Sequence, residues 1–135
     1  MDFGTAVGRY FSNYFNFEDR ARRAEYWWPI VMQILVYIIF MIPGMLLAAN
    51  TTGAASASLF WSLAAGYVMF GMACFIPTLA VTVRRLHDTD KSGFWMLLGF
   101  VPFGGLVLLY FFVQSGTLGP NKYGPDPKRP LHDIF

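Results

Sequence analysis

The stretch that decides the fold runs from Tyr26 to Val83 and reads YWWPIVMQILVYIIFMIPGMLLAANTTGAASASLFWSLAAGYVMFGMACFIPTLAVTV. Its 58 residues include no Asp, Glu, Lys, Arg or His, whereas about a quarter of the residues in an ordinary soluble domain are charged. A soluble chain of this length could not hide such a stretch. A bilayer favours it, because a charge at mid-membrane costs a few kcal/mol, about 3 on insertion scales. The sequence therefore predicts an integral membrane protein.

The composition of the whole chain supports this class. Charged residues make up 13% of the 135 residues and apolar residues 56%, and the length fits one membrane domain, 1–135. The net charge of +2 is too small to predict a nucleic-acid partner. The single cysteine, Cys74, excludes an internal disulfide and a cysteine-based metal site.

Three apolar segments predict an all-α integral membrane fold with about three transmembrane helices. The expected spans are 28–49, 59–83 and 94–113, each about as long as the 20 residues that cross a bilayer core. Pro102 and the pair Gly104-Gly105 break the third segment in its middle. Residues 114–135 are rich in Gly and Pro, which predicts a tail of turns.

An amphipathic helix is expected before the first span. Aromatic and apolar residues recur at steps of three and four between residues 3 and 15, so one helix face is apolar. This helix either lies at the membrane interface or packs on the rest of the protein, and the pattern fits both. Residues 17–25 form a charged collar, in which the i,i+4 pairs Glu18–Arg22 and Asp19–Arg23 favour a helix. Together, residues 1–25 make the cytoplasmic N-terminal segment.

The basic residues predict a cytoplasmic N-terminus. Four Lys or Arg residues precede the first span, three lie between the second and third apolar segments, and three lie in the tail. Three full spans with the N-terminus inside put seven inside and three outside, as the positive-inside rule requires. A re-entrant hairpin turning at Pro102–Gly105 would bring all ten inside. We favour three spans, because twenty apolar residues are enough to cross.

Polar residues at the two ends of the uncharged stretch are the candidate site. Arg84-Arg85-Leu86-His87-Asp88 ends the second span at the depth where headgroups begin. These residues either anchor the topology, form an ion-pair network with acidic collar residues, or donate hydrogen bonds to anionic lipid headgroups. The candidate cytoplasmic cluster consists of Arg20, Arg23, Glu25, Arg84, Arg85, His87 and Asp88.

We expect no catalytic residue, cofactor or metal, and no enzymatic activity. The sequence has no Gly-rich phosphate loop, no Gly-x-Ser-x-Gly elbow and no pair of carboxylates within a span. His87, Asp88 and Asp90 lie together in one loop, which is a weak metal signal without a spaced histidine partner. An ion-coupled transporter usually needs an ionisable residue at membrane depth, and none occurs here.

Small residues on the second span predict a role in packing. Ser58, Ser62 and Gly66 recur every four residues and form a stripe that a second helix can approach closely. We therefore expect a non-enzymatic partner of other membrane proteins, or of a second copy of this chain. The alternative is a small channel or transporter component, because proline interrupts all three spans and broken helices often line transport sites.

Three motifs together resemble one family, the YhaH-like small bacterial inner-membrane proteins. The motifs, in chain order, are Phe17-x-x-Arg20-x-x-Arg23-x-Glu25-Tyr26-Trp27, Arg84-Arg85-Leu86-His87-Asp88-Thr89-x-x-Ser92-Gly93-Phe94-Trp95 and Gly119-Pro120-Asn121-Lys122-Tyr123-Gly124-Pro125-Asp126-Pro127. Two departures occur, since Asp19 and Asp90 stand where the family usually has Gly. The resemblance implies a multi-pass protein of the bacterial inner membrane with a domain of unknown function, and it supplies no activity or catalytic residue.

Overall fold

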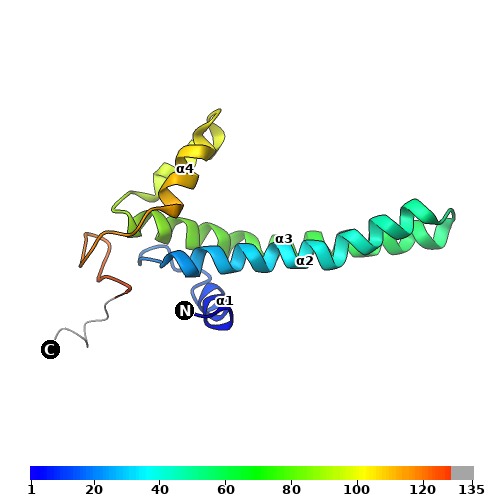
Figure 1. Ribbon diagram of the computed structural model, residues 1–135, viewed down its shortest axis with the longest axis horizontal. Helices are drawn as coiled ribbons and strands as arrows, with labels where there is room; N and C mark the ends of the chain where they lie inside the picture. The colour runs from blue at the N-terminus through cyan, green and yellow to red at the C-terminus, as the bar shows by residue number, and fades with distance from the viewer. Residues whose placement is uncertain (129–135) are drawn as a thin grey trace. The chain divides into compact units, whose positions relative to one another are not determined.

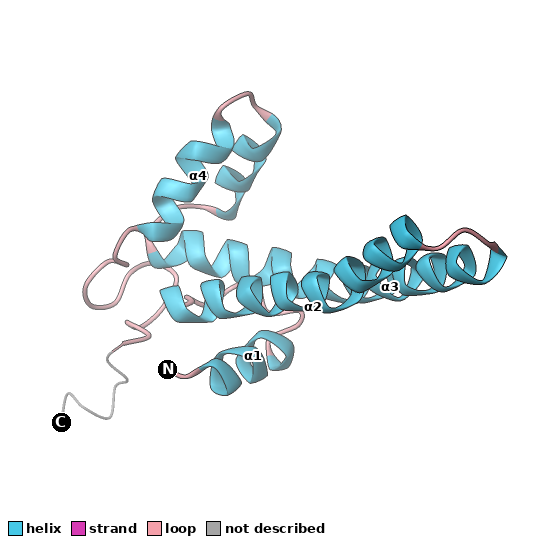
Figure 2. Cartoon of the chain, turned by 45° about the vertical axis from the view of Figure 1, so that its right-hand side comes forward, coloured by secondary structure: helices cyan, strands magenta, loops and turns pink. Residues whose placement is uncertain are grey.

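The computed structural model describes residues 1–128, which form helices and loops with a single isolated β-bridge and no strand (Figure 2). The chain divides into two compact units, one of Met1–Pro29 with Pro77–Phe135 and the other of Ile30–Ile76. We call them unit 1 and unit 2. The helices are α1 (Phe3–Ser12), α2 (Arg23–Asn50), α3 (Ala54–Asp88), the 3₁₀ helix η1 (Gly93–Phe100) and α4 (Gly104–Val113) (Figure 1).

The two longest helices contain the expected first and second spans. The 28 residues of α2 and the 35 of α3, at about 1.5 Å per residue, exceed the roughly 30 Å of a bilayer core. Both are long and apolar enough to cross a membrane. The connection between them is shorter than the expected loop 50–58, because α3 begins at Ala54. Pro77 lies inside α3 without ending it.

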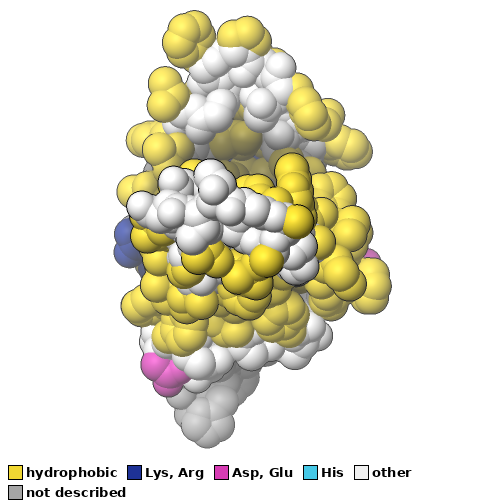
Figure 3. Space-filling view, turned by 90° about the vertical axis from the view of Figure 1, so that its right-hand side faces the viewer, with side chains coloured by type: hydrophobic (Ala, Val, Ile, Leu, Met, Phe, Trp, Pro, Cys, Tyr) yellow, Lys and Arg dark blue, Asp and Glu magenta, His cyan; other side chains and the backbone are white. Residues whose placement is uncertain are grey.

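Unit 2 is a pair of helices that lie side by side in opposite directions (Figure 1). Gly44 of α2 permits the close approach, since a Cβ added there would lie 3.2 Å from a methyl group of Leu63. The rings of Tyr37 and Tyr67 meet edge to face with centroids 5.5 Å apart. Most other large apolar side chains of this unit are exposed, and the face in Figure 3 is dominated by hydrophobic side chains with few charged ones visible.

The N-terminal helix α1 packs within unit 1 through one face. Ala6 and Tyr10 are buried, and the Tyr10 hydroxyl lies 2.7 Å from the Thr78 hydroxyl. Phe3 meets Trp28 edge to face, while Phe15 beyond the helix is 76% exposed. The Asp2 carboxylate accepts a hydrogen bond from the Thr5 amide and caps the helix.

The expected helix across the collar is wrong. Residues 13–22 form turns and bends, and α2 begins only at Arg23. The Asn16 side chain accepts hydrogen bonds from the backbone amides of Glu18 and Asp19, which is the local competition that disfavours a helix. The Ala21 amide donates to the Arg84 carbonyl oxygen at 3.0 Å. The backbone of the collar is therefore bound to the end of α3, and the predicted pairs of Glu18 with Arg22 and of Asp19 with Arg23 are not among the ion pairs of residues 1–128.

The break expected in the middle of 94–113 is present, and it divides this segment into two helices that are each too short to be a single span. The segment forms two short helices, η1 and α4, which pack against each other within unit 1 (Figure 2). The chain reverses at Val101–Phe103, where Phe103 has the left-handed φ of 63°. Gly104 lies so close to the Leu98 carbonyl that an added Cβ would overlap it. The Pro102–Gly105 break is therefore the turn of a helical hairpin, which was the alternative interpretation of the sequence.

Candidate functional site

Asp88, at the end of α3, is the centre of a buried ion-pair cluster in unit 1. Its carboxylate oxygen Oδ1 lies 3.1 Å from Arg20 Nε and 3.0 Å from Arg20 Nη2. Its other oxygen accepts a hydrogen bond from Arg85 Nη1. All three residues are at least 95% buried. One carboxylate is thus shared by two arginines through charge-assisted hydrogen bonds, which are stronger than neutral ones.

The same residues bind the tail through its backbone. Arg20 donates to the carbonyl oxygens of Thr117 at 2.6 Å and Gly119 at 2.7 Å. The Thr117 amide donates to the Asp88 carbonyl oxygen at 2.8 Å. Arg85 donates to the carbonyl oxygen of Gln114, just after α4. The collar, the end of α3 and the tail therefore meet at one cluster.

A second ion-pair group surrounds Glu25, in the first turn of α2. Glu25 Oε1 lies 3.3 Å from Arg9 Nε and 3.7 Å from Arg84 Nη1. Glu25 Oε2 accepts a hydrogen bond from the Arg22 amide at 3.0 Å. Arg84 is 2% exposed, and its Nε and Nη2 atoms are buried without a hydrogen-bond partner. Of the two ion-pair groups, only this one leaves an arginine incompletely paired.

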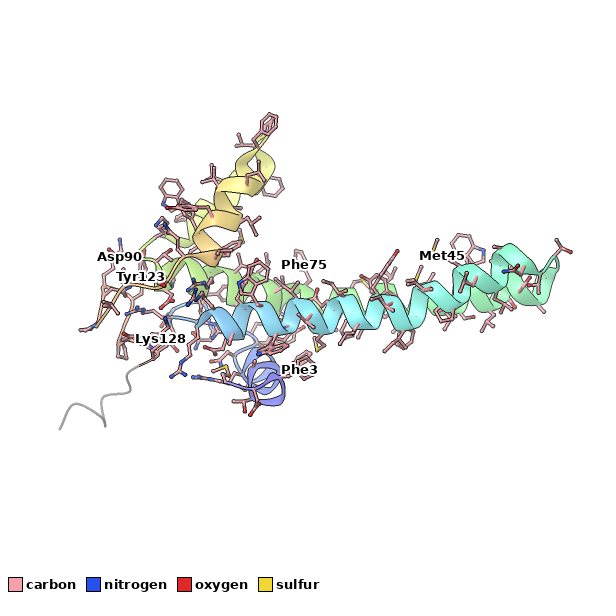
Figure 4. All side chains as sticks on the ribbon, in the orientation of Figure 1. Phe3, Met45, Phe75, Asp90, Tyr123 and Lys128 are labelled. Atoms are coloured by element: carbon pink, nitrogen blue, oxygen red, sulfur yellow. The ribbon has the colours of Figure 1, made fainter. Side chains whose placement is uncertain are left out.

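His87 is held in place by contacts with the tail and the collar. Its ring stacks on Tyr123 of the tail, with centroids 3.8 Å apart, and Nδ1 lies within 3.3 Å of the Glu18 and Asp19 carbonyl oxygens. The Asn121 amide group donates to the His87 carbonyl oxygen at 2.9 Å. Figure 4 labels Tyr123 of the tail and Asp90 of the neighbouring loop in this part of unit 1. Residues of the third motif therefore bind those of the second.

Burial is the largest cause of the pKa shifts of Arg84, Arg85 and His87, which lie at the end of α3 beyond its apolar part. Burial lowers the pKa of the Arg85 guanidinium, and the Asp88 carboxylate offsets part of that change. The pKa of Arg84 falls for the same reason, with Glu25 opposing the change. Arginine stays protonated in proteins, so both groups keep their charge. Burial also lowers the pKa of His87, with hydrogen bonds to the Asp19 and Glu18 carbonyls opposing it, so the ring is mostly neutral at pH 7.

The structure brings six of the seven predicted cluster residues into this buried region. Arg23 is the exception, because it is exposed and donates to the Val113 carbonyl oxygen at 3.3 Å, outside both ion-pair groups. The sequence pattern did not indicate Arg9 or the tail residues Thr117, Asn121 and Tyr123 as members of this cluster. The third motif was the signal for the tail, but the favoured three-span topology separated it from the other two.

The small-residue stripe lies elsewhere, in unit 2. Ser58, Ser62 and Gly66 are all exposed. A Cβ added at Gly66 would meet no atom within 4 Å, so α2 does not cover this face of α3. The Ser62 hydroxyl donates to the Ser58 carbonyl oxygen of its own helix, which leaves this polar group satisfied in an apolar environment.

The arrangement in unit 1 holds segments together and concentrates positive charge. Within residues 1–128 no three His, Cys, Asp or Glu side chains are grouped in a way that could hold a metal ion. The Asp88 carboxylate already accepts from both neighbouring arginines, which is the arrangement of a structural ion pair. The incompletely paired guanidinium of Arg84 is the feature that does not fit a purely structural role.

Comparison with known proteins gives a consistent result. The family described as Protein of unknown function (DUF805) matches residues 14–125. Inner membrane protein YhaH of Escherichia coli (strain K12) is 44% identical over 121 residues, covering 86% of this chain and 90% of that protein. Inner membrane protein YhaI of the same organism is 43% identical over 117 residues, covering 86% and 89%. No solved structure matches the chain.

Proposed function

This chain belongs to the DUF805 family and is an inner-membrane protein, and from this premise we propose that it acts without enzymatic chemistry, by packing against other membrane proteins or a second copy of itself. The resemblance to YhaH-like proteins in the sequence agrees with this family assignment. The proposal concerns unit 2, whose two helices leave most of their apolar surface uncovered.

The uncovered stripe of Ser58, Ser62 and Gly66 carries the proposal. Small residues let two helix backbones approach closely in a bilayer, where association depends on packing and lipid tails are as apolar as leucine. Gly44, the glycine that admits a close contact within unit 2, faces Leu63 and Phe60 of α3. The stripe is a different surface of α3 from the one that meets Gly44 of α2, and it is available to a helix from another chain.

The proposed topology has two spans, within α2 and α3, and a cytoplasmic N-terminus. The η1–α4 pair enters the membrane from the cytoplasmic side and returns, and the tail ends on that side. This topology places all ten Lys and Arg residues of the sequence inside, as the positive-inside rule favours. Trp27, Trp28 and Tyr26 then lie at headgroup level as an aromatic belt, in contact with membrane lipids.

Crosslinking in native membranes tests the packing proposal with three proteins: the natural sequence, Gly66→Leu and Gly71→Leu. Gly71 is the matched control, because a Cβ there also meets nothing within 4 Å, yet it lies about 140° around the helix from Gly66 at roughly 100° per residue. An amine-reactive crosslinker should yield species larger than the monomer for the natural protein and for Gly71→Leu. Gly66→Leu should lose them, because leucine fills the close-approach surface.

Two results would contradict the proposal. One is monomer alone in all three proteins, which would leave the stripe without a partner. The other is the same crosslinked species in Gly66→Leu as in the natural protein, which would move the contact to a different face of the chain.

A further inference from the structure

Arg9, Asn13, Asp19, Arg20, Arg84 and Tyr123 line a cavity of about 240 Å³ in unit 1, together with two prolines of the tail. One water needs only roughly 10–15 Å³ of such space, so the cavity can take a small polar ion with part of its hydration shell. Its walls come from α1, the collar, α3 and the tail, which are the segments that the ion-pair clusters hold together.

Arg84 is the most unusual residue of this wall. The side chain is 3% exposed, and it forms an ion pair with Glu25 through the 3.7 Å approach of Nη1 to Oε1. The Nε and Nη2 donors are buried and have no hydrogen-bond partner, and neither has the buried Oε1 of Glu25, so this pair leaves two donors but only one acceptor unsatisfied. Leaving a buried donor of a charged group unpaired costs more than the roughly 1–3 kcal/mol of a neutral group, so folded proteins nearly always satisfy such groups. A buried guanidinium beside a cavity is therefore an unused hydrogen-bonding fork.

The neighbouring Arg20, in contrast, has a guanidinium group whose nitrogens are paired with acceptors. Its nitrogens donate to Asp88 and to carbonyl oxygens of Thr117 and Gly119. Arg20 therefore contributes charge to the cavity but has its donors already engaged. Arg9 is different again, because its side chain is 48% exposed and only Nε approaches Glu25, at 3.3 Å. Of the three arginines that line the cavity, Arg9 and Arg84 therefore have hydrogen-bond donors available to a ligand.

The charge of the cavity favours an anion. Three arginines and one aspartate line it, which gives a formal charge of +2. Glu25, behind Arg84 and Arg9, reduces this to +1 when it is included. The aspartate in this count is Asp19, whose carboxylate also accepts a hydrogen bond from the Asn16 side chain. An oxyanion would supply the acceptors that the buried fork lacks, and the planar guanidinium matches the oxygens of phosphate.

We propose that this cavity binds a phosphate-bearing anion, held by the buried fork of Arg84 and closed at its outer side by Arg9. The phosphate comes either from a lipid headgroup at the cytoplasmic surface or from a soluble phosphate. The proposal is independent of the helix-packing proposal, because no residue of unit 2 lines the cavity.

The test uses the full chain purified in dodecyl maltoside, whose headgroup contains no phosphate. In one arm, sodium phosphate is titrated at constant ionic strength, and the thermal unfolding midpoint is followed. In the other arm, the micelles receive dioleoyl phosphatidylglycerol in place of phosphate. Ligand that binds only the folded state raises the midpoint as its concentration rises. We expect a saturable rise in at least one arm, and the arm that responds identifies the source.

Three variants make the test specific. Arg84→Lys keeps the charge but loses the fork, and Arg9→Gln removes the exposed arginine while leaving Arg84 beside Glu25. Each should raise the apparent Kd about tenfold or more, the size expected for losing a charged hydrogen bond. Arg23→Gln is the matched control, because Arg23 is exposed and does not line the cavity, and it should bind as the natural protein does.

Either of two results overturns the proposal. The first is that neither phosphate nor phosphatidylglycerol produces a saturable rise in the thermal unfolding midpoint. The second is binding by Arg9→Gln that equals that of the natural protein, or a loss in Arg23→Gln as large as that in Arg9→Gln, which would indicate adsorption to surface charge. Should Arg84→Lys fail to fold, Arg9→Gln alone decides between these outcomes.

Discussion

At the scale of the residue, Asp88 determines whether the buried arginines of unit 1 are paired. Its two carboxylate oxygens accept from Arg20 and Arg85. Asp88→Asn keeps the shape but removes the charge, so two buried arginines lose their counter-ion. Breaking a buried pair in this way costs about 3–5 kcal/mol. We expect a clear fall in the thermal unfolding midpoint in detergent, measured by tryptophan fluorescence.

The neighbouring Asp90 provides the control for Asp88. Asp90 is exposed and has no ion pair among those of residues 1–128, so Asp90→Asn should leave the midpoint nearly unchanged. Equal midpoints for Asp88→Asn and the natural protein would show that the two arginines find other partners, such as the tail carbonyls.

The backbone at Asp90 leads to a second residue-scale prediction. Asp90 has a φ of 58°, the left-handed region that glycine adopts without strain and that Asp tolerates better than most residues. This geometry explains why glycine would suit the position. Asp90→Gly should therefore be neutral or stabilising by less than about 1 kcal/mol, and Asp90→Val destabilising by about 1–3 kcal/mol. Unfolding midpoints of the two variants, compared with Asp90→Asn, measure the difference; a stable Val variant would argue against a left-handed residue there.

Much of the cluster was predictable from the sequence because charge is rare in this chain. The charges at the two ends of the uncharged stretch had to return to one side if that stretch contained two spans. Glu25 and Arg84 do meet, and Arg85 and Asp88 are neighbours on one helix turn. Which carboxylate pairs with which arginine could not be predicted, because the long arginine side chains reach several partners.

At the scale of the element, the η1–α4 hairpin depends on Gly104. A Cβ at this position would overlap the Leu98 carbonyl oxygen, a backbone atom that cannot move aside easily. Gly104→Ala should therefore force the two helices apart and destabilise the hairpin by about 1–3 kcal/mol. Hydrogen exchange of the α4 amides is the measurement, and faster exchange is the expected result.

Gly105 is the matched control for Gly104, since both are glycines in the first turn of α4. A Cβ at Gly105 meets nothing within 4 Å, and alanine favours a helix over glycine by up to about 1 kcal/mol. Gly105→Ala should leave α4 exchange unchanged or slower. Faster exchange in both variants would show that the substitutions destabilise the turn and not the packing of η1 on α4.

The sequence alone did not decide whether residues 94–113 form one span or a hairpin of two short helices. Length and apolarity alone allow residues 94–113 to cross a membrane, and the same residues are long enough for two short antiparallel helices. Pro102 and Gly104-Gly105 marked the break correctly. The deciding interactions are made elsewhere, by Arg20 and Asp88 with the tail carbonyl and amide of Thr117, and these long-range bonds leave no periodic pattern in the sequence.

At the scale of the whole molecule, the bonds between collar and tail predict the side on which the tail lies. Thr117 and Gly119 accept hydrogen bonds from Arg20, so the tail and the collar must share one aqueous compartment. With the cytoplasmic N-terminus that we propose from the positive-inside rule, the tail should be cytoplasmic too. A third full span would separate them.

Single cysteines introduced in a Cys74→Ala background measure this sidedness. Leu118→Cys reports the tail, where Leu118 is 84% exposed, and Thr52→Cys reports the exposed connection between α2 and α3. A membrane-impermeant maleimide applied to intact spheroplasts should label Thr52→Cys, and it should label Leu118→Cys only after permeabilisation. Labelling of Leu118→Cys in intact spheroplasts would put the tail outside and would be incompatible with its hydrogen bonds to a cytoplasmic collar. Labelling of neither cysteine before permeabilisation would instead show that the connection between α2 and α3 does not reach the outer surface, and would contradict the two-span proposal.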